Sequence, residues 1–407
     1  MTTATVDLFD LDRFADGPPH ELFRRLRAEQ PVCFLPEPAG PGYWGVFGYD
    51  DVVTVSRHPD RFGSHPNTMI RDPAGGDAGA GALMLNQDPP RHTQLRKLVN
   101  RGFTPRQVAT LTPRVQAIVD RLLDGVAARG RFDLVADVAV ELPLQVIAEL
   151  VGVPEEDRHR VFAWTERMMS LDDPELGGTE ADAHEAIQAM FAYADRLAAE
   201  RAGGGGSDLL SVLLAAEVEG ERLGPHDVDL FFLLLMNAGS ETTRNLITGG
   251  TLALFEHPSE RARLQRDLDL VPSAVEEMLR FVTPVLHFRR TAREDTELGG
   301  QHVRAGDKVV VWYASANRDE AQFPNADRFD IMRAPNDHVA FGAGGPHFCL
   351  GAGLARLEAR LLFQGLLRRF PDLCPDGPVR RLRSNFINGI KSLPVAVTAA
   401  PGPADAS

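Results

Sequence analysis

Cysteine is scarce in this chain, and its three cysteines, Cys33, Cys349 and Cys374, lie far apart. An odd number of widely spaced cysteines argues against a disulfide framework and favours a reducing compartment. Long apolar runs are missing too, because the longest, Leu230–Met236, falls well short of the roughly 20 residues that a membrane helix needs. The first residues are mixed and acidic, without the apolar stretch of a secretion signal. We therefore expect a cytoplasmic protein with no membrane span.

Positive charge is also in short supply. The 43 Lys and Arg residues are outnumbered by 57 Asp and Glu residues, which gives a net charge of −14. A nucleic-acid-binding protein needs a basic face for phosphate groups, so this class is excluded. With 43% hydrophobic and 25% charged residues, the composition is that of an ordinary globular protein.

No linker or internal repeat divides the 407 residues. We therefore predict a single domain over residues 1–407, with a flexible tail from about residue 400. Glycine-rich runs at 75–81 and 203–206 predict flexible loops. The hydrophobic periodicity predicts a mainly α fold with a smaller β region. Helices are expected at 20–29, 50–58, across most of 106–202, at 227–255 and at 272–281, and strands at 43–49, 298–300, 301–303 and 308–312.

The most informative stretch is the loop Phe341–Gly351, which holds four glycines, a proline and Cys349. Such a loop turns tightly and lets its backbone approach another group closely. A helical pattern with Leu354, Leu357 and Leu361 opens directly after it. Cys349 therefore lies beside a helix N-terminus, where free N–H groups and the helix dipole stabilise a thiolate.

Taken alone, this cysteine has two readings. It is either a buried structural residue, which is common for a free cysteine, or a ligand for a metal. Zinc is a poor choice, because His347 and Cys349 supply only two ligands and no Cys/His cluster lies nearby in the sequence.

The whole loop strongly resembles the haem-thiolate motif of the cytochrome P450 superfamily. The resemblance implies that Cys349 is the axial ligand of the iron of haem b, with Phe341 and Gly351 beside the cofactor. It also implies the cytochrome P450 fold, in which haem lies between a long central helix and the cysteine loop.

A second motif lies in the helix expected at 227–255, whose first half is apolar all round. The polar run Asn237–Thr243 interrupts it, and apolar residues resume from Leu246. Polar groups in a buried helix are costly unless they are bonded, so the helix either emerges into solvent here or uses them. The run resembles the superfamily's acid–alcohol pair, which implies that Glu241 and Thr242 relay protons for oxygen chemistry beside the small residues Ala238 and Gly239.

Basic residues elsewhere match the positions that hold the haem propionates. Asp88 and two prolines predict a helix start, and His92 and Arg96 follow at i,i+4 on one helix face. Without the evidence of the cysteine loop, His92 and Arg96 could equally belong to a basic helix face that is exposed to solvent. The resemblance also assigns Arg290, rather than Arg289, and His347 to the propionates.

The resemblance places five residues against the substrate. They are Met84, Ala238, Val285, Leu286 and Phe386, and Met84 is otherwise a plain core residue. Glu277 and Arg280 resemble the superfamily's Glu-x-x-Arg, completed by Arg328, and are read as a structural network beneath the cysteine loop. An ordinary surface pair is the alternative.

The resemblance covers nearly the whole chain and implies a monooxygenase that hydroxylates an unactivated C–H bond of a hydrophobic small molecule with O2. Three features resemble those of the actinobacterial branch that acts on steroids and methyl-branched lipids. They are the extra residue between Phe341 and Cys349, the run Ala238–Asn245 and the Gly-Ile-Lys at 389–391. No flavin or iron–sulfur segment is fused to the chain, so electrons come from a separate ferredoxin with its reductase, or from a flavodoxin. Arg91, Lys97, Arg101, Arg356 and Arg360 are candidates for its docking patch.

Two other functions remain open. One is an oxygenase acting on an acyl group tethered to a carrier protein, and the other is a haem-binding protein without turnover.

Overall fold

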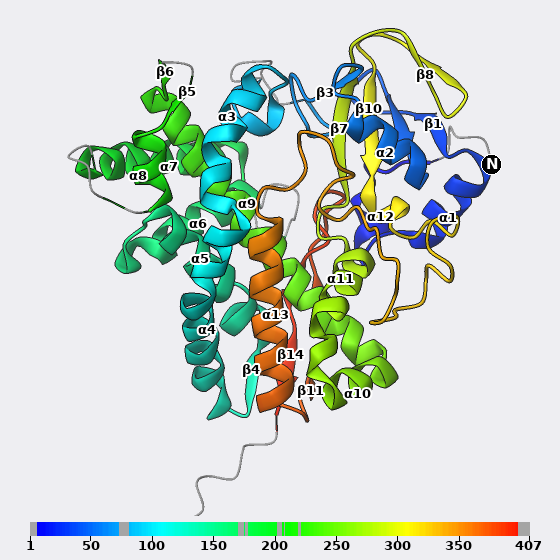
Figure 1. The fold of residues 1–407 in the computed structure, drawn as a ribbon. Coiled ribbons are helices and arrows are strands. Elements are labelled where there is room, and N and C mark those ends of the chain that lie inside the picture. Colours follow the sequence, from blue (N-terminus) through cyan, green and yellow to red (C-terminus); the bar gives the residue numbers. More distant parts are fainter. Residues whose placement is uncertain are drawn as a thin grey trace, which may run out of the picture.

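The computed structural model describes residues 6–72, 81–169, 175, 178–201, 206, 208–218 and 221–397. Helices dominate it, as the sequence predicts (Figure 1). Their bounds are α1 His20–Glu29, α2 Tyr49–Arg57, α3 Arg91–Asn100, α4 Pro105–Ala127, α5 Glu141–Val151, α6 Arg158–Met169, α7 Glu180–Arg201, α8 Leu209–Leu214, α9 Pro225–Glu256, α10 Pro258–Arg266, α11 Val271–Val282, α12 Tyr313–Ala316 and α13 Ala352–Arg369.

The largest sheet has five strands in the order β1-β2-β10-β7-β3. Its strands are β1 Val32–Leu35, β2 Tyr43–Val46, β3 Phe62–Gly63, β7 His287–Ala292 and β10 Lys308–Trp312. Only β10 and β2 pair in parallel, and the other neighbours are antiparallel. The remaining strands form small sheets from β4 Arg131–Asp133, β5 Glu217–Val218, β6 Glu221–Arg222, β8 Thr296–Leu298, β9 Gln301–Val303, β11 Cys374–Pro375, β12 Arg380–Arg381, β13 Ile390–Ser392 and β14 Pro394–Ala396.

The long helix α9 runs through the middle of the molecule, α13 stands in front of it in this view, and the five-stranded sheet lies at the upper right (Figure 1). Its 32 residues span about 48 Å at 1.5 Å per residue. Residues along α9 are buried on several faces, because α5, α7 and α11 pack around it. A helix buried in this way explains the apolar run at its start.

Most expected elements are present with shifted ends. The strand expected at 43–49 stops at Val46, because Tyr49 already begins α2 and its N–H donates to the Asp319 carboxylate at 2.8 Å. Asp88 does not cap α3 with its side chain, which instead accepts a hydrogen bond from the backbone N–H of Ser64 at 2.7 Å. The loops predicted to be flexible, at 75–81 and 203–206, and the tail from about 400 lie almost entirely outside the described residues.

The Glu277–Arg280 pair on α11 is fully buried, with neither side chain exposed to solvent. The third member of the network is not the Arg328 side chain that the sequence suggested. Arg333 lies 3.2 Å from the Glu277 carboxylate, whereas Arg328 offers only its backbone carbonyl to Arg280 and keeps a side chain that is 60% exposed. The network ties α11 to the segment that leads into the cysteine loop, so its role is structural. None of the helices in the described part of the chain is long and apolar enough to cross a membrane.

Candidate active site

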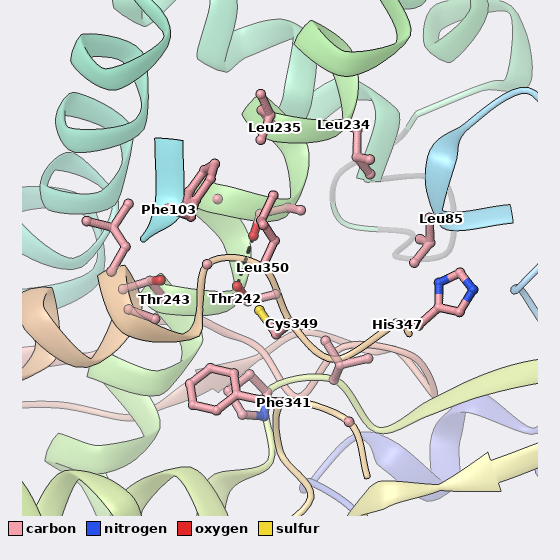
Figure 2. Close-up of a pocket in the computed structure, with 18 of the residues that line it drawn as sticks. Leu85, Phe103, Leu234, Leu235, Thr242, Thr243, Phe341, His347, Cys349 and Leu350 are labelled. Carbon is pink, nitrogen blue, oxygen red and sulfur yellow. Dashed lines mark hydrogen bonds between the residues drawn. The ribbon is translucent and has the colours of Figure 1, made fainter. Parts of the chain in front are cut away.

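A large cavity opens between α9 and the loop that carries Cys349 (Figure 2). Its empty volume is about 1480 Å³, including the space at its mouth. It is lined by residues from α3, α5, α9, α11, β7 and α13 and from the Cys349 loop. Segments that are far apart in the sequence therefore meet around one space.

The cysteine loop has the backbone that its glycines predict. Gly342, Gly344 and Gly345 all have positive φ angles, a conformation that other residues adopt only at a cost. At Gly345 a Cβ would lie 2.2 Å from the backbone oxygen of Ser56, so no side chain fits there. The N–H of Cys349 donates to the carbonyl of Phe341 at 2.9 Å and closes the loop.

Cys349 lines the cavity, whereas Cys33 and Cys374 do not. By surface area Cys349 is exposed, as a residue that lines an open cavity can be. Burial raises the pKa of the Cys349 thiol, and the backbone N–H groups of Gly351 and Ala352 oppose this rise, as do Arg96 and Arg356. A partner carrying positive charge on the cavity side would complete the stabilisation of a thiolate.

Two imidazoles and two guanidiniums meet at one end of the cavity. The rings of His92 and His347 lie 4.0 Å apart, and Arg96 and Arg290 line the same space. Burial lowers the pKa of His92 to about 4 and also lowers the pKa of His347 strongly, with nearby Arg side chains adding to the effect. Both rings are therefore neutral at pH 7, and the two guanidiniums carry the positive charge.

The polar run on α9 divides between the cavity and the protein interior. The Thr242 hydroxyl donates to the Ala238 carbonyl at 3.0 Å, and both residues line the cavity (Figure 2). Glu241 is 5% exposed and does not line the cavity, because its carboxylate accepts a hydrogen bond from Arg244 at 3.0 Å. Gly239 lines the cavity beside Ile147 of α5, and a Cβ on Gly239 would lie 2.7 Å from the Ile147 side chain.

This geometry agrees with the comparison with protein families. The family model for cytochrome P450 matches residues 8–391. The chain belongs to the cytochrome P450 family. It is a haem-dependent oxidoreductase, and its fold and cofactor are confirmed as the sequence predicted.

Three similar proteins show where this cytochrome P450 stands in the family. A methyl-branched lipid omega-hydroxylase of Mycobacterium tuberculosis is 44% identical, with 96% of this chain and 94% of the relative covered. A steroid C26-monooxygenase of Rhodococcus jostii is 42% identical, covering 97% of this chain and 85% of the relative. A Mycobacterium marinum cytochrome P450 solved with pseudoionone has a TM-score of 0.92 and 41% identity, covering 97% and 98% of the two chains.

The residues around the cavity fit haem. Cys349 offers a sulfur ligand, and the four side chains at the polar end offer N–H donors for the two propionate groups. The Nδ1 atom of His92 is buried and has no hydrogen-bond partner among the described residues, as expected of a donor that awaits an acceptor. Arg290 is 5% exposed and lines the cavity, whereas Arg289 pairs with Asp72, which agrees with the choice made from the sequence.

The other residues named from the sequence divide into two groups. Phe341, Gly351, Met84, Ala238 and Val285 line the cavity, as expected. Leu286 and Phe386 do not.

The strand geometry explains this difference. Neighbouring residues in an extended chain point to opposite sides, so Leu286 turns away from Val285 into the core cluster that contains Trp312. Phe386 packs against the rings of His287 and Phe288, with centroids 5.4 and 5.6 Å away, and Phe288 takes the place at the cavity.

Sequence reasoning missed several lining residues. Leu234 and Phe231 come from the apolar start of α9, and a helix that is apolar all round does not reveal which face meets a cavity. Glu358 on α13 is 2% exposed, and burial raises its pKa to about 8. A signal for Glu358 did exist, because it follows Leu354 by four residues and so lies on the apolar stripe of its helix.

Proposed function

We propose that this cytochrome P450 hydroxylates an unactivated C–H bond of a hydrophobic small molecule. The apolar part of the cavity supports this proposal. Met84, Leu85, Phe231, Leu234, Leu235, Val285 and Phe288 are among the many apolar residues that line the cavity, and among the described residues its only charged residue types are Arg96, Arg290 and Glu358. A substrate bound there has little need for a charged group, and burial of its apolar surface supplies most of the binding energy.

Within this proposal the residues of the site have separate roles. Haem, when bound, supplies the activation of dioxygen and the transfer of oxygen to carbon. Cys349 binds the iron, and His92, Arg96, Arg290 and His347 hold the propionates. The Thr242 hydroxyl lies at the cavity wall and relays protons there, and the Glu241 carboxylate passes protons to it from the protein interior.

The proteins similar to this one support a substrate class. Two of the relatives are named for their substrates, which are methyl-branched lipids and steroids. Both kinds of molecule have terminal methyl groups. We propose a substrate of this kind, with its apolar end in the cavity. A terpenoid or an acyl group tethered to a carrier protein is the competing substrate.

Electrons would come from a separate ferredoxin or flavodoxin. Two members of the expected basic patch are already paired, Arg91 with Asp227 at 3.0 Å and Arg356 with Glu276 at 2.7 Å. Lys97 on α3 and Arg360 on α13 are exposed, and both helices flank the cysteine loop. We propose that these two contact the partner, and their change to Glu should slow reduction by ferredoxin without changing substrate affinity.

The test is an optical titration of the purified protein. The absorption band of haem should be present before any ligand is added, and the Cys349→Ser variant should show this band at a different wavelength. Steroids and methyl-branched fatty acids should then displace water from the iron and shift the spectrum at micromolar concentration. Product is then measured with NADPH, a ferredoxin and its reductase.

The other outcomes separate the alternatives. A shift with carrier-tethered acyl groups alone would place the protein among the carrier-dependent oxygenases. Haem binding without product from any of these substrates would favour a haem protein without turnover. Absence of haem absorption from the intact chain would refute the role of Cys349.

A further inference from the structure

Arg244 lies between two carboxylates that come from different helices. Its Nη1 donates to Glu241 on the same helix at 3.0 Å and lies 3.8 Å from the Glu166 carboxylate on α6. The first distance is a hydrogen bond, whereas the second is an ion pair without one. One guanidinium therefore serves two competing acceptors.

The two carboxylates differ in their access to water. The Glu241 side chain is 6% exposed and that of Arg244 is 10% exposed, whereas that of Glu166 is 53% exposed. Glu241 depends on Arg244, because a buried carboxylate without a partner is costly. Glu166 can exchange Arg244 for water at little cost.

Arg244 and its neighbour Asn245 carry polar atoms without a partner in the described part of the chain. Arg244 Nε and both polar atoms of the Asn245 side chain are buried and have no hydrogen-bond partner among the described residues. Asn245 follows Glu241 by four residues on α9, so the two side chains lie on the same helix face. Such atoms are commonly bonded to internal water, or become bonded when a side chain moves.

We infer that Arg244 is a positioning residue that holds the Glu241 carboxylate away from the cavity, and that Glu166 on α6 is the competing partner that releases it. When Arg244 turns to Glu166, the Glu241 carboxylate loses its strongest partner and is free to turn toward Thr242. The position of α6 then controls proton delivery. This inference rests on the proton-carrying role proposed above for Glu241.

The electrostatics of Glu166 agree with the competition. Burial raises the pKa of its carboxyl, Arg244 lowers it, and the negative charge of Glu241 raises it. Glu166 therefore interacts with both members of the α9 pair. No other acidic residue forms an ion pair with Arg244 in the described part of the chain.

The first experiment uses Glu166→Gln in the complete haem enzyme, with Glu156→Gln as the matched control. Glu156 is an exposed carboxylate just before α6. Without the Glu166 carboxylate, Arg244 pairs with Glu241 alone. The amount of product per NADPH consumed should therefore fall about two- to fivefold, a range suited to an ion pair with one exposed partner. The solvent deuterium isotope effect should increase, and Glu156→Gln should change neither quantity.

A Glu241→Gln background separates the mechanism from a general charge effect. There Glu166→Gln should cause no further loss, because the residue on which it acts is gone. An equal loss in both backgrounds, or a Glu166→Gln enzyme that behaves like Glu156→Gln, would overturn the inference.

The second experiment needs no turnover. Urea unfolding of Glu166→Gln, Arg244→Gln and the double variant gives the coupling free energy between Glu166 and Arg244. This coupling free energy should be measurable, but smaller than the value from the same cycle on Glu241 and Arg244. No coupling between 166 and 244 would refute the competition itself. If no substrate is turned over but the coupling is present, the proposed function fails while the shared guanidinium stands.

Discussion

Two ion pairs with the same spacing, Glu277–Arg280 on α11 and Glu241–Arg244 on α9, have very different surroundings. Around Arg280 the donors are matched by acceptors, since it bonds both oxygens of Glu277 and the carbonyls of Asn317, Ala326 and Arg328. Arg244 instead leaves its Nε without a partner in the described structure and divides its Nη1 between two carboxylates. The first pair is fixed, and the second has an alternative arrangement.

The difference shows that a buried ion pair is rigid only when its remaining hydrogen-bonding groups are also satisfied. The structural pair has such a network beneath the cysteine loop. The Glu241–Arg244 pair lacks such a network, because Arg244 Nε has no hydrogen-bond partner in the described part of the chain. A third pair of the same spacing, Glu21–Arg24 on α1, lies on the surface with side chains 81% and 50% exposed.

The largest effect should come from breaking the fixed pair. Glu277→Gln leaves the guanidiniums of Arg280 and Arg333 without their buried carboxylate, so the free energy of unfolding should fall by about 3–5 kcal/mol. Urea unfolding at pH 7 measures the change. Arg328→Gln is the control and should unfold like the unchanged protein, because only its backbone carbonyl takes part.

Breaking the adjustable pair should affect catalysis more than stability. Glu241→Gln removes the proposed proton carrier, so product formation should fall about 10²-fold, the lower end of what general acid–base catalysis contributes. Its unfolding free energy should change less than that of Glu277→Gln. The comparison would be wrong if Glu241→Gln kept full turnover or unfolded more easily than Glu277→Gln.

Glu276 provides an intermediate case, since it pairs with Arg356 at 2.7 Å and is 31% exposed. Burial raises its pKa, but bonds to His338 and Arg356 outweigh this and lower the pKa to about 2. A lowered folded-state pKa gives stability that is present above the unfolded value of 4.5 and is lost as the pH falls toward 2. After a discount for solvent screening we expect about 1–2 kcal/mol.

The measurement compares Glu276→Gln with the unchanged protein in urea at several pH values. The variant should be less stable at pH 6, and the difference should shrink between about pH 5 and pH 2. A constant difference over this range would mean that the carboxylate charge is not the source of the stability.

The smallest effect should come from the surface pair. Glu21→Gln should leave the unfolding midpoint and turnover unchanged within error, because water replaces Arg24 as the partner of an exposed side chain. A loss as large as that of Glu276→Gln would show that spacing alone, rather than surroundings, sets the value of these pairs.

The sequence by itself determined the family, the α-rich fold and the central elements of the site. Gly342, Gly344 and Gly345 adopt positive φ angles, which glycine allows without steric cost, so the glycine content of the cysteine loop already indicated a tight turn. The uninterrupted apolar start of α9 and its polar run likewise marked a buried helix with a site on it. These are local properties, and local chemistry is what a sequence displays directly.

Tertiary structure alone decided which side chains face one another. Arg333 rather than Arg328 completes the buried network, and Phe288 rather than Phe386 reaches the cavity. Glu241 does not line the cavity, and its carboxylate is held by Arg244 on the same helix. The direction of a side chain depends on elements that are distant in the sequence. The pairs Glu277–Arg280, Glu241–Arg244 and Glu21–Arg24 have the same spacing but differ in burial and in hydrogen-bond partners, because the fold sets both.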